Sequence, residues 1–305
     1  MNISKLLNNV DYTAIHGSTE REVSSLTYDS RSVSAGSCFF AIEGVVADGH
    51  NYIDSAVTKG AVAVVCKRLP ESLNTDQTTY IVVEDTDKAM ALMASNYYGN
   101  PSQKITVVGV TGTNGKTTTK ELIKTVLSVK YNVTATEGNL NNSIGVPLTL
   151  LKIDSKTQLA VVEMGASHPG DIKELVDIAL PNFGLITNVG KAHLLGFGSF
   201  EGVKKTKGEL YDYLRRTADK VFLNVDNPHL CAMASERNLQ SDPERPYSLV
   251  IPYGLDYQQA KVYPSDPENP FLRIELNGRI IKTNLVGSYN ADNVMAALCV
   301  GAQFG

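Results

Sequence analysis

Residues 107–119 have the sequence Val107-Val108-Gly109-Val110-Thr111-Gly112-Thr113-Asn114-Gly115-Lys116-Thr117-Thr118-Thr119. The apolar run that ends at Val110 predicts a buried parallel strand, and the apolar spacing after Lys116 predicts a helix. A strand, a glycine loop and a helix in this order form a phosphate-binding loop, in which backbone N–H groups and the lysine bind phosphate and a Thr hydroxyl binds Mg²⁺. The sequence therefore predicts a nucleotide-binding protein, with these residues at the nucleotide: Gly112, Thr113, Asn114, Gly115, Lys116, Thr117 and Thr118.

The composition is that of an ordinary globular protein with room for about two domains, since 43% of the 305 residues are apolar and 20% are charged. A net charge of −4 gives no basic surface, which argues against a nucleic acid partner. The four cysteines show no CxxC spacing, so we expect reduced core residues rather than a zinc site or disulfides. We find no signal peptide or membrane span, and we expect a cytoplasmic monomer.

Residues 1–100 predict a small α/β domain. Short strands and helices alternate there, with strands at 24–28, 38–42, 61–66 and 80–83 and helices at 51–58 and 88–98. Asp29-Ser30-Arg31 follows the first strand, where the Arg fork and the Ser hydroxyl could bind an anionic ligand. A capped surface turn explains the same three residues equally well.

Residues 101–305 predict a doubly wound, mainly parallel sheet. Strands are expected at 105–110, 132–136, 158–163, 183–189 and 221–225, and helices after Lys116 and at 168–178, 200–215 and 290–301. The ligands of such a sheet gather at the carboxyl ends of its strands. From about residue 249 to 285 short alternating runs predict a small antiparallel appendage.

Polar residues follow the expected strands near the phosphate loop. Glu163 ends one strand, where a carboxylate suits Mg²⁺, although a capping Glu would look the same. His193 follows the next strand, and a loop histidine is more often structural than a ligand. Lys207 lies on the following helix, where a solvated basic face is the alternative. Amides cluster in Gly138-Asn139-Leu140-Asn141-Asn142, which is either a turn or a site that hydrogen-bonds a peptide or carboxylate.

These motifs together resemble the Mur ligase family, the ATP-dependent amide-bond ligases of bacterial cell-wall precursor synthesis. The loop from Thr111 to Thr118 is similar to the family's ATP loop, including the absence of the first glycine, at whose position Val110 stands. Three stretches resemble the branch that adds D-alanyl-D-alanine, and they lie at 137–147, 163–168 and 190–199.

The resemblance implies a role for each residue. Thr117 and Glu163 would bind one Mg²⁺, His193 would bind a second, and Lys207 would be a carbamylated lysine beside it. Lys116, Lys207 and His193 are then the catalytic set. The resemblance also implies that Asn290 and Asn293 lie on the adenine side of ATP and that Ser30 and Arg31 contact UDP. Asn139, Asn141 and Asn142 are the remaining candidates for substrate binding.

The implied reaction activates the carboxylate of UDP-N-acetylmuramoyl-tripeptide. The carboxylate attacks the γ-phosphate of ATP to give an acyl phosphate, and the amine of D-Ala-D-Ala then displaces phosphate. Lys116 and two Mg²⁺ ions would allow the two anions to approach each other.

Two features depart from this branch. The first domain, with Leu26 to Arg31 and Asp48 to Ile53, is closer to the branch that adds a diamino acid to the dipeptide. The chain also stops at Gly305, before the family's C-terminal domain, so we expect nucleotide binding without complete ligation. The alternatives are therefore the dipeptide ligase, a folate polyglutamylating ligase, and a non-catalytic nucleotide-binding module.

Overall fold

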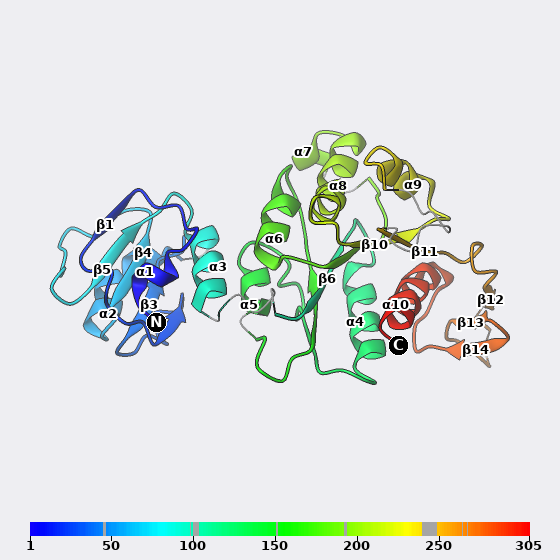
Figure 1. The fold of residues 1–305 in the computed structure, drawn as a ribbon, viewed down its shortest axis with the longest axis horizontal. Helices are drawn as coiled ribbons and strands as arrows, with labels where there is room; N and C mark the ends of the chain where they lie inside the picture. The colour runs from blue at the N-terminus through cyan, green and yellow to red at the C-terminus, as the bar shows by residue number, and fades with distance from the viewer. Residues whose placement is uncertain are drawn as a thin grey trace. The chain divides into compact units, whose positions relative to one another are not determined.

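The computed structural model describes residues 1–44, 47–97, 99, 104–150, 152–191, 194–239, 249–263, 265–266 and 268–305. The chain divides into two compact units, Met1–Pro101 and Ser102–Gly305, and each has a sheet of its own (Figure 1).

The first unit is built on a five-stranded sheet in the order β1-β5-β4-β3-β2. Strands β2 to β5 are parallel and β1 runs antiparallel to β5. The small α/β fold is thus confirmed, and the short α1 and β1 are additions to the sequence prediction. The elements are α1 (Ile3–Leu6), β1 (Ala14–His16), β2 (Ser25–Thr27), β3 (Ser37–Phe40), the 3₁₀ helix η1 (Gly49–Tyr52), α2 (Ile53–Thr58), β4 (Ala63–Cys66), β5 (Thr79–Val82) and α3 (Thr86–Tyr97).

The second unit is built on a six-stranded parallel sheet in the order β11-β10-β9-β6-β8-β7. Its elements as far as α8 are β6 (Thr106–Thr111), α4 (Lys116–Leu127), β7 (Val133–Ala135), α5 (Gly145–Leu150), β8 (Leu159–Glu163), α6 (Asp171–Ala179), β9 (Phe183–Ile186), α7 (Leu194–Phe197) and α8 (Phe200–Thr217). The elements that follow are β10 (Lys220–Asn224), α9 (Pro228–Ser235), β11 (Val250–Tyr253), β12 (Lys261–Tyr263), β13 (Arg273–Leu276), β14 (Arg279–Lys282), η3 (Ser288–Asn290) and α10 (Ala291–Phe304).

One part of the sequence prediction was wrong. The antiparallel appendage was expected from residue 249, but β11 pairs in parallel with β10 and is the outer strand of the main sheet. Pro252 lies in β11, and a proline is tolerated in an edge strand because one side of that strand needs no ladder hydrogen bonds. The appendage is the three-stranded antiparallel sheet β12-β13-β14.

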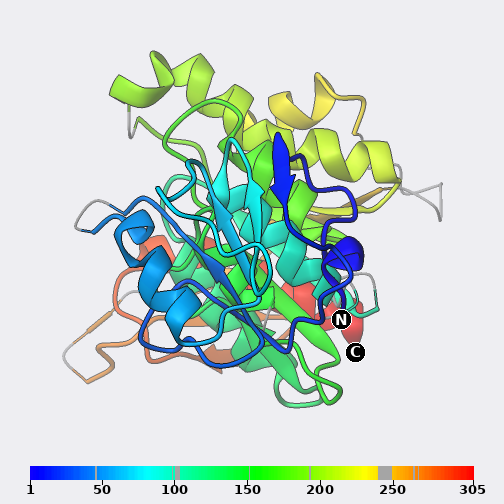
Figure 2. The same ribbon diagram turned by 90° about the vertical axis from the view of Figure 1, so that its left-hand side faces the viewer.

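Helices cover both faces of the parallel sheet. Val108 and Val110 of β6 pack in one core cluster with residues of α4 and α10, and these two helices lie side by side in Figure 1. Gly109 points to the other face, where an added Cβ would lie 2.6 Å from Met164 Cε. Helices α6 and α8 cover that second face, and α9 (yellow in Figure 2) packs beside α8.

The chain order makes β6 the switch point of the sheet. The chain leaves β6 for β7 and β8 on one side and then crosses to β9 on the other. Val110 pairs with Glu163 of β8 and with Leu185 of β9. The carboxyl ends of β6, β8 and β9 therefore meet at one place, where ligands of doubly wound sheets bind.

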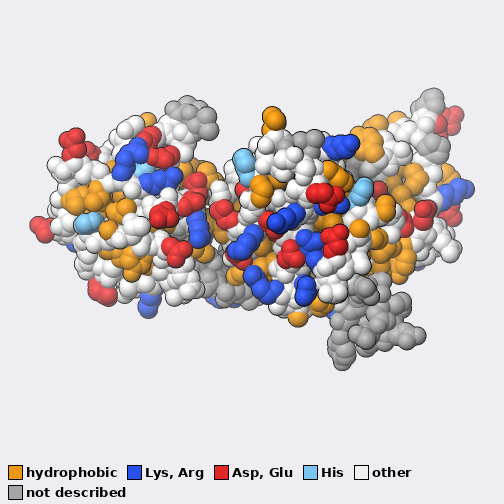
Figure 3. Space-filling view, turned by 90° about the horizontal axis from the view of Figure 1, so that it is seen from above, with side chains coloured by type: hydrophobic (Ala, Val, Ile, Leu, Met, Phe, Trp, Pro, Cys, Tyr) orange, Lys and Arg blue, Asp and Glu red, His pale blue; other side chains and the backbone are white. Residues whose placement is uncertain are grey.

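The surface and the helices agree with the composition. Acidic and basic side chains are interspersed on the face of the described residues that Figure 3 shows. No described helix combines the length and the apolar character needed to cross a bilayer. Three of the four cysteines are buried and all four are free thiols.

Candidate active site

The loop between β6 and α4 requires glycine at its first position. Gly112 has a φ of +143°, and an added Cβ would lie 2.0 Å from Oγ1 of Thr187, at the end of β9. Gly115 has a φ of +76° and its added Cβ would meet the side chain of Asn293. Glycine is needed here because the loop is pressed against two other elements. Val110, where the general motif has glycine, is a fully buried strand residue, so no turn is needed at that point.

The loop is fastened to the segment that follows β9. Asn188 accepts two of its backbone N–H groups, that of Thr113 at its main-chain oxygen (2.9 Å) and that of Asn114 at Oδ1 (3.0 Å). The Thr187 hydroxyl donates to the Asn114 carbonyl (2.6 Å). Helix α4 begins at Lys116 without a side-chain cap, so its first-turn N–H groups are those left to bind an anion.

Two lysines bring positive charge to this loop. Lys116 is half-buried and its Nζ donates to the Thr113 carbonyl at 3.0 Å. Burial lowers the pKa of Lys116, and the Glu163 carboxylate opposes that shift. Lys207 of α8 is 3% exposed, and burial, with the charge of Lys116, lowers its pKa to about 8. The charge of Lys116 thus acts on the amine of Lys207, although their helices, α4 and α8, cover opposite faces of the sheet.

Glu163 is held at the carboxyl end of β8 with one oxygen unused. The residue is 1% exposed, and its Oε1 accepts from the Thr117 hydroxyl (3.2 Å) and from the Asn141 amide (2.7 Å). Its Oε2 is buried and has no hydrogen-bond partner among the described residues. An orphaned carboxylate oxygen beside a Thr hydroxyl fits Mg²⁺, which takes oxygen ligands and completes its shell with water and phosphate. The residues present therefore fit the predicted metal.

The amide-rich stretch, residues 138–142, contacts Glu163. Asn141 contacts the carboxylate, and its backbone carbonyl accepts the N–H of Gly165 at 2.6 Å. Asn142 instead uses its Oδ1 to accept the Gly145 N–H at the start of α5, and Asn139 is exposed. A polar hollow of about 180 Å³ adjoins this stretch, lined by Asn141, Asn142, Ser143, Gly165, Ala166, Ser167, Asp171, Glu174 and Leu175.

Asn290 and Asn293 join α10 to the phosphate loop. Asn293 Oδ1 accepts from the Thr119 hydroxyl (3.0 Å), and its Nδ2 donates to Asn290 Oδ1 (3.0 Å). Asn290 in turn donates to the Val286 carbonyl. Both residues are buried, and Asn293 lies against the end of the loop, since a Cβ added at Gly115 would be 2.6 Å from its Oδ1.

In the first unit, Ser30 and Arg31 follow β2. Arg31 forms a two-pronged ion pair with Asp29, with Nε–Oδ1 at 2.9 Å and Nη2–Oδ2 at 2.8 Å, and this pair lowers the pKa of Asp29 to about 2. The Ser30 carbonyl accepts from Lys59. The Arg31 side chain is 88% exposed, so its guanidinium is open to solvent.

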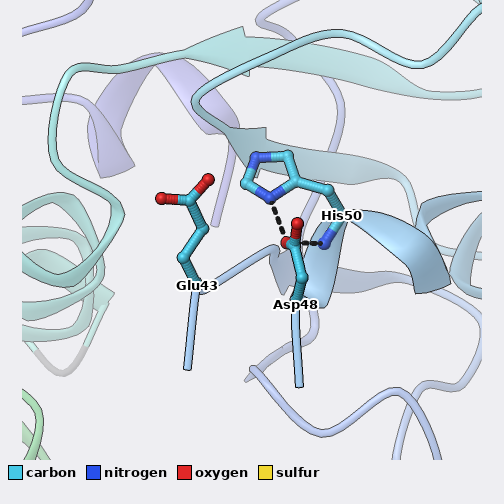
Figure 4. A group of neighbouring side chains, drawn as sticks. All are labelled: Glu43, Asp48 and His50. Atoms are coloured by element: carbon cyan, nitrogen blue, oxygen red, sulfur yellow. Dashed lines mark hydrogen bonds and ion pairs between the residues drawn. The ribbon is translucent and has the colours of Figure 1, made fainter. Parts of the chain in front are cut away.

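A second polar cluster in this unit is Glu43, Asp48 and His50, whose ligand-type atoms lie within 4.8 Å of one another (Figure 4). His50 Nδ1 bonds to Asp48 at 2.7 Å, and its Nε2 accepts the Lys67 N–H at 3.0 Å. Glu43 pairs with Lys67 and Arg68. Since both ring nitrogens are engaged and the carboxylates have cationic partners, this cluster is an ion-pair network and not a metal site.

His193 lies outside the described residues, so its place at the site stays a prediction. The sequence reasoning missed Thr187 and Asn188, which fasten the loop, and Thr136, whose hydroxyl accepts the Glu163 N–H at 3.0 Å. It also missed Lys120, which is fully buried in α4. Thr187, Asn188 and Thr136 were missed because the predicted strands, 183–189 and 132–136, included them, whereas the strands end at Ile186 and Ala135. Lys120 has the position of an ordinary helix-surface lysine.

The family comparison matches both units. Residues 110–301 match the Mur ligase middle domain, and residues 22–98 match the domain described as Mur ligase family, catalytic domain.

Individual relatives are similar over nearly the whole chain. A UDP-N-acetylmuramoyl-tripeptide–D-alanyl-D-alanine ligase of Haemophilus influenzae is 33% identical over 95% of this chain and 62% of its own length. A UDP-N-acetylmuramoyl-L-alanyl-D-glutamate–2,6-diaminopimelate ligase of Clostridium acetobutylicum is 31% identical over 98% of this chain and 63% of its own length. The crystal structure of MurF ligase from Thermotoga maritima in complex with ADP is 31% identical, with a TM-score of 0.75 over 93% of this chain and 64% of that one. The chain thus spans about three fifths of the length of the relatives it matches.

Proposed function

This chain belongs to the Mur ligase family, and from that premise we propose that it carries the ATP site and the acceptor site of a ligase that joins D-Ala-D-Ala to UDP-N-acetylmuramoyl-tripeptide. Residues 1–100 would bind the UDP end of the acceptor and residues 101–305 would bind ATP. The substrates of this reaction are cytoplasmic cell-wall precursors, and we therefore propose that the protein is located in the cytoplasm.

One observation carries the proposal. The buried carboxylate of Glu163 stands at the end of the strand beside the phosphate loop, 3.2 Å from the Thr117 hydroxyl, and keeps one oxygen without a partner among the described residues. A capping or surface glutamate would be satisfied by water or by backbone N–H groups. An unsatisfied buried oxygen is expensive unless a ligand completes its coordination.

The chain's own residues account for the binding of two anions. The first-turn N–H groups of α4 and the Lys116 amine bind the triphosphate. Asn141 holds Glu163 in place, and the amides and Ser143 that line the polar hollow beside it would hydrogen-bond the peptide of the acceptor. Bound Mg²⁺, held by Thr117 and Glu163, would neutralise the charge between the triphosphate and the acceptor carboxylate. The carboxylate then displaces ADP from the γ-phosphate, and the D-Ala-D-Ala amine displaces phosphate from the acyl carbon.

Lys207 is proposed to carry a carbamate. The Lys207 ammonium first loses one proton, and the neutral amine then attacks CO₂, forms an N–C bond and releases a second proton, so that a cation becomes an anion. A pKa near 8 leaves a substantial neutral fraction of Lys207 at cytoplasmic pH. Together with His193, the carbamate would hold a second Mg²⁺. We expect Lys207→Ala to abolish ligation, and full activity of this variant would contradict the assignment.

The remaining assignments concern substrate contacts. Ser30 and the exposed Arg31 would contact the UDP diphosphate, because a guanidinium fork matches phosphate oxygens. Asn139, Asn141 and Asn142 would contact the peptide of the acceptor, and Asn290 and Asn293 would lie on the adenine side of ATP. A monomer remains our expectation for the oligomeric state.

The rival is the ligation that adds a diamino acid to the UDP-linked dipeptide. The first-domain motifs and the similarity to the 2,6-diaminopimelate ligase favour it. A ligation assay with ATP and Mg²⁺ separates the two when UDP-linked tripeptide with D-Ala-D-Ala is compared with UDP-linked dipeptide with diaminopimelate. The assay should be run on the chain and again with the unmatched part of a relative supplied, since the chain spans about three fifths of such proteins.

Each outcome has one reading. Turnover only with tripeptide supports the proposal, and turnover only with dipeptide supports the rival. Nucleotide binding without either product would favour a non-catalytic module.

A further inference from the structure

Lys120 is a buried cation that contacts no solvent. It lies on α4, four residues after Lys116, and its side chain is 0% exposed. Its Nζ donates to the main-chain oxygen of Thr136 at 2.5 Å and pairs with Glu121 at 2.9 Å. Two of the three N–H donors of the amine thus have partners within this chain, and the side chain is closed to solvent.

Thr136 connects this lysine to Glu163. It follows β7 at the carboxyl edge of the sheet, where its N–H donates to the Val161 carbonyl at 3.0 Å. Its hydroxyl oxygen accepts the Glu163 N–H at 3.0 Å. The loop that begins at Thr136 also carries Asn141, which donates to the Glu163 carboxylate. Lys120 thus holds Thr136, the first residue of a loop that contacts Glu163 twice. Thr136 contacts the Glu163 backbone N–H and Asn141 contacts the Glu163 carboxylate.

Packing alone does not explain a charge at this position. Removing an ammonium from water costs several kcal/mol even when it is paired, and a methionine of similar volume would fill the same space without that cost. The ammonium offers what a methionine cannot, which is a directional bond between the helix that bears Thr117 and the loop that bears Asn141.

We propose that Lys120 is a positioning residue for the metal end of the nucleotide site: by holding Thr136 it sets the Glu163 carboxylate at the distance from Thr117 that a divalent cation requires. This inference rests on the proposed function, because it assumes that Glu163 and Thr117 hold Mg²⁺. Residues that orient metal ligands change metal affinity when they are removed, by about 10- to 100-fold.

The test measures ATP binding to the 305-residue chain by calorimetry, once in EDTA and once across a Mg²⁺ titration. We expect Lys120→Met to raise the Mg²⁺ concentration needed for half of the gain in ATP affinity by about tenfold or more. ATP affinity in EDTA should stay within about twofold of wild type, because Lys116 and the first turn of α4 are untouched. Lys124→Met, on the same helix, is the matched control and should change neither value.

A second variant reaches the same link from the other side. Thr136→Val keeps the volume and removes the hydroxyl oxygen that accepts the Glu163 N–H, so it should give the same Mg²⁺-specific loss. If Lys120→Met does not fold, this variant still tests the Thr136–Glu163 half of the link, and a folded Thr136→Val chain with the Mg²⁺ response of wild type would overturn the proposal. In a Glu163→Gln background, Lys120→Met should add nothing further, since its effect passes through that carboxylate.

The failures are distinguishable. A wild-type chain that binds no ATP in either condition would overturn the proposed function. A wild-type chain with a normal Mg²⁺ response, beside folded variants that keep the same response, would overturn the role of Lys120 alone. Equal losses in EDTA and in Mg²⁺ would also overturn it, because a general structural defect produces that result.

Discussion

Replacing Lys207 with methionine should stabilise the protein at neutral pH. The pKa of Lys207 falls from its ordinary 10.5 to about 8 in the folded chain, chiefly because the amine is buried. Each pKa unit is worth about 1.4 kcal/mol, so the charged amine costs the folded state about 3 kcal/mol. Lys207→Met keeps most of the apolar stem and removes that charge. We therefore expect its free energy of unfolding at pH 7 to exceed that of wild type by about 3 kcal/mol.

The pH dependence has a definite direction. Between pH 8 and 10.5 the unfolded lysine binds more protons than the folded one, so wild-type stability rises with pH in that window. The advantage of Lys207→Met is complete below about pH 8 and should vanish near pH 10.5. Denaturant unfolding in CO₂-free buffer without nucleotide measures the difference, with the exposed Lys205→Met as control. A Lys207→Met chain that is less stable than wild type at pH 7, or a difference that does not change with pH, would refute the reasoning.

Two further substitutions test the loop and the first unit. Gly112→Ala should destabilise the chain by more than about 3 kcal/mol and abolish ATP binding, because the new Cβ would clash with Thr187 and the residue has a positive φ. Gly138→Ala is the control, since Gly138 also has a positive φ but has open space around it. This control should lower the free energy of unfolding by only about 1 kcal/mol, as measured by thermal or denaturant unfolding. Arg31→Ala should leave the free energy of unfolding essentially unchanged, because its pair with Asp29 is exposed. It should nevertheless weaken the binding of UDP-N-acetylmuramoyl-tripeptide about tenfold in a binding titration. Unchanged binding in Arg31→Ala would remove this residue from the substrate site.

The sequence was most informative where the chain alternates between strand and helix at short range. Strand β6, the glycine loop and the start of α4 at Lys116 agree with the pattern, because an apolar β-branched run, two glycines and a helical spacing all favour the same structure. The end of β8 at Glu163 was likewise predicted to the residue, while its start lies one residue later than predicted. Parallel topology then brings strand tips together without any further information from side chains.

The sequence was least informative where tertiary contacts decide. The segment that forms β11 is not preceded and followed by a clear alternation of strands and helices, and it contains Pro252. Its local sequence therefore does not show whether it is the edge strand of the main sheet or part of a separate antiparallel sheet. Lys120 has the helical spacing of a surface residue, and the local sequence does not show that its amine reaches the carbonyl of Thr136, sixteen positions away. The short α5, α7 and α9 were also missed, since four to eight residues carry too little periodicity to stand out.

The two buried lysines, Lys120 and Lys207, differ in the hydrogen-bond acceptors that surround their amines. Lys120 has two acceptors, whereas no hydrogen-bond acceptor for the Lys207 amine occurs among the described residues. The Lys207 amine lies 5.7 Å from the centre of the Phe197 ring. Near the same loop, Glu163 keeps an oxygen without a partner. An anion alone would satisfy the Lys207 amine in its uncarbamylated form and repel this carboxylate, and a cation alone would do the reverse. We therefore propose that these unmet groups of both signs belong to one site, since a nucleotide that arrives with a divalent cation would satisfy both.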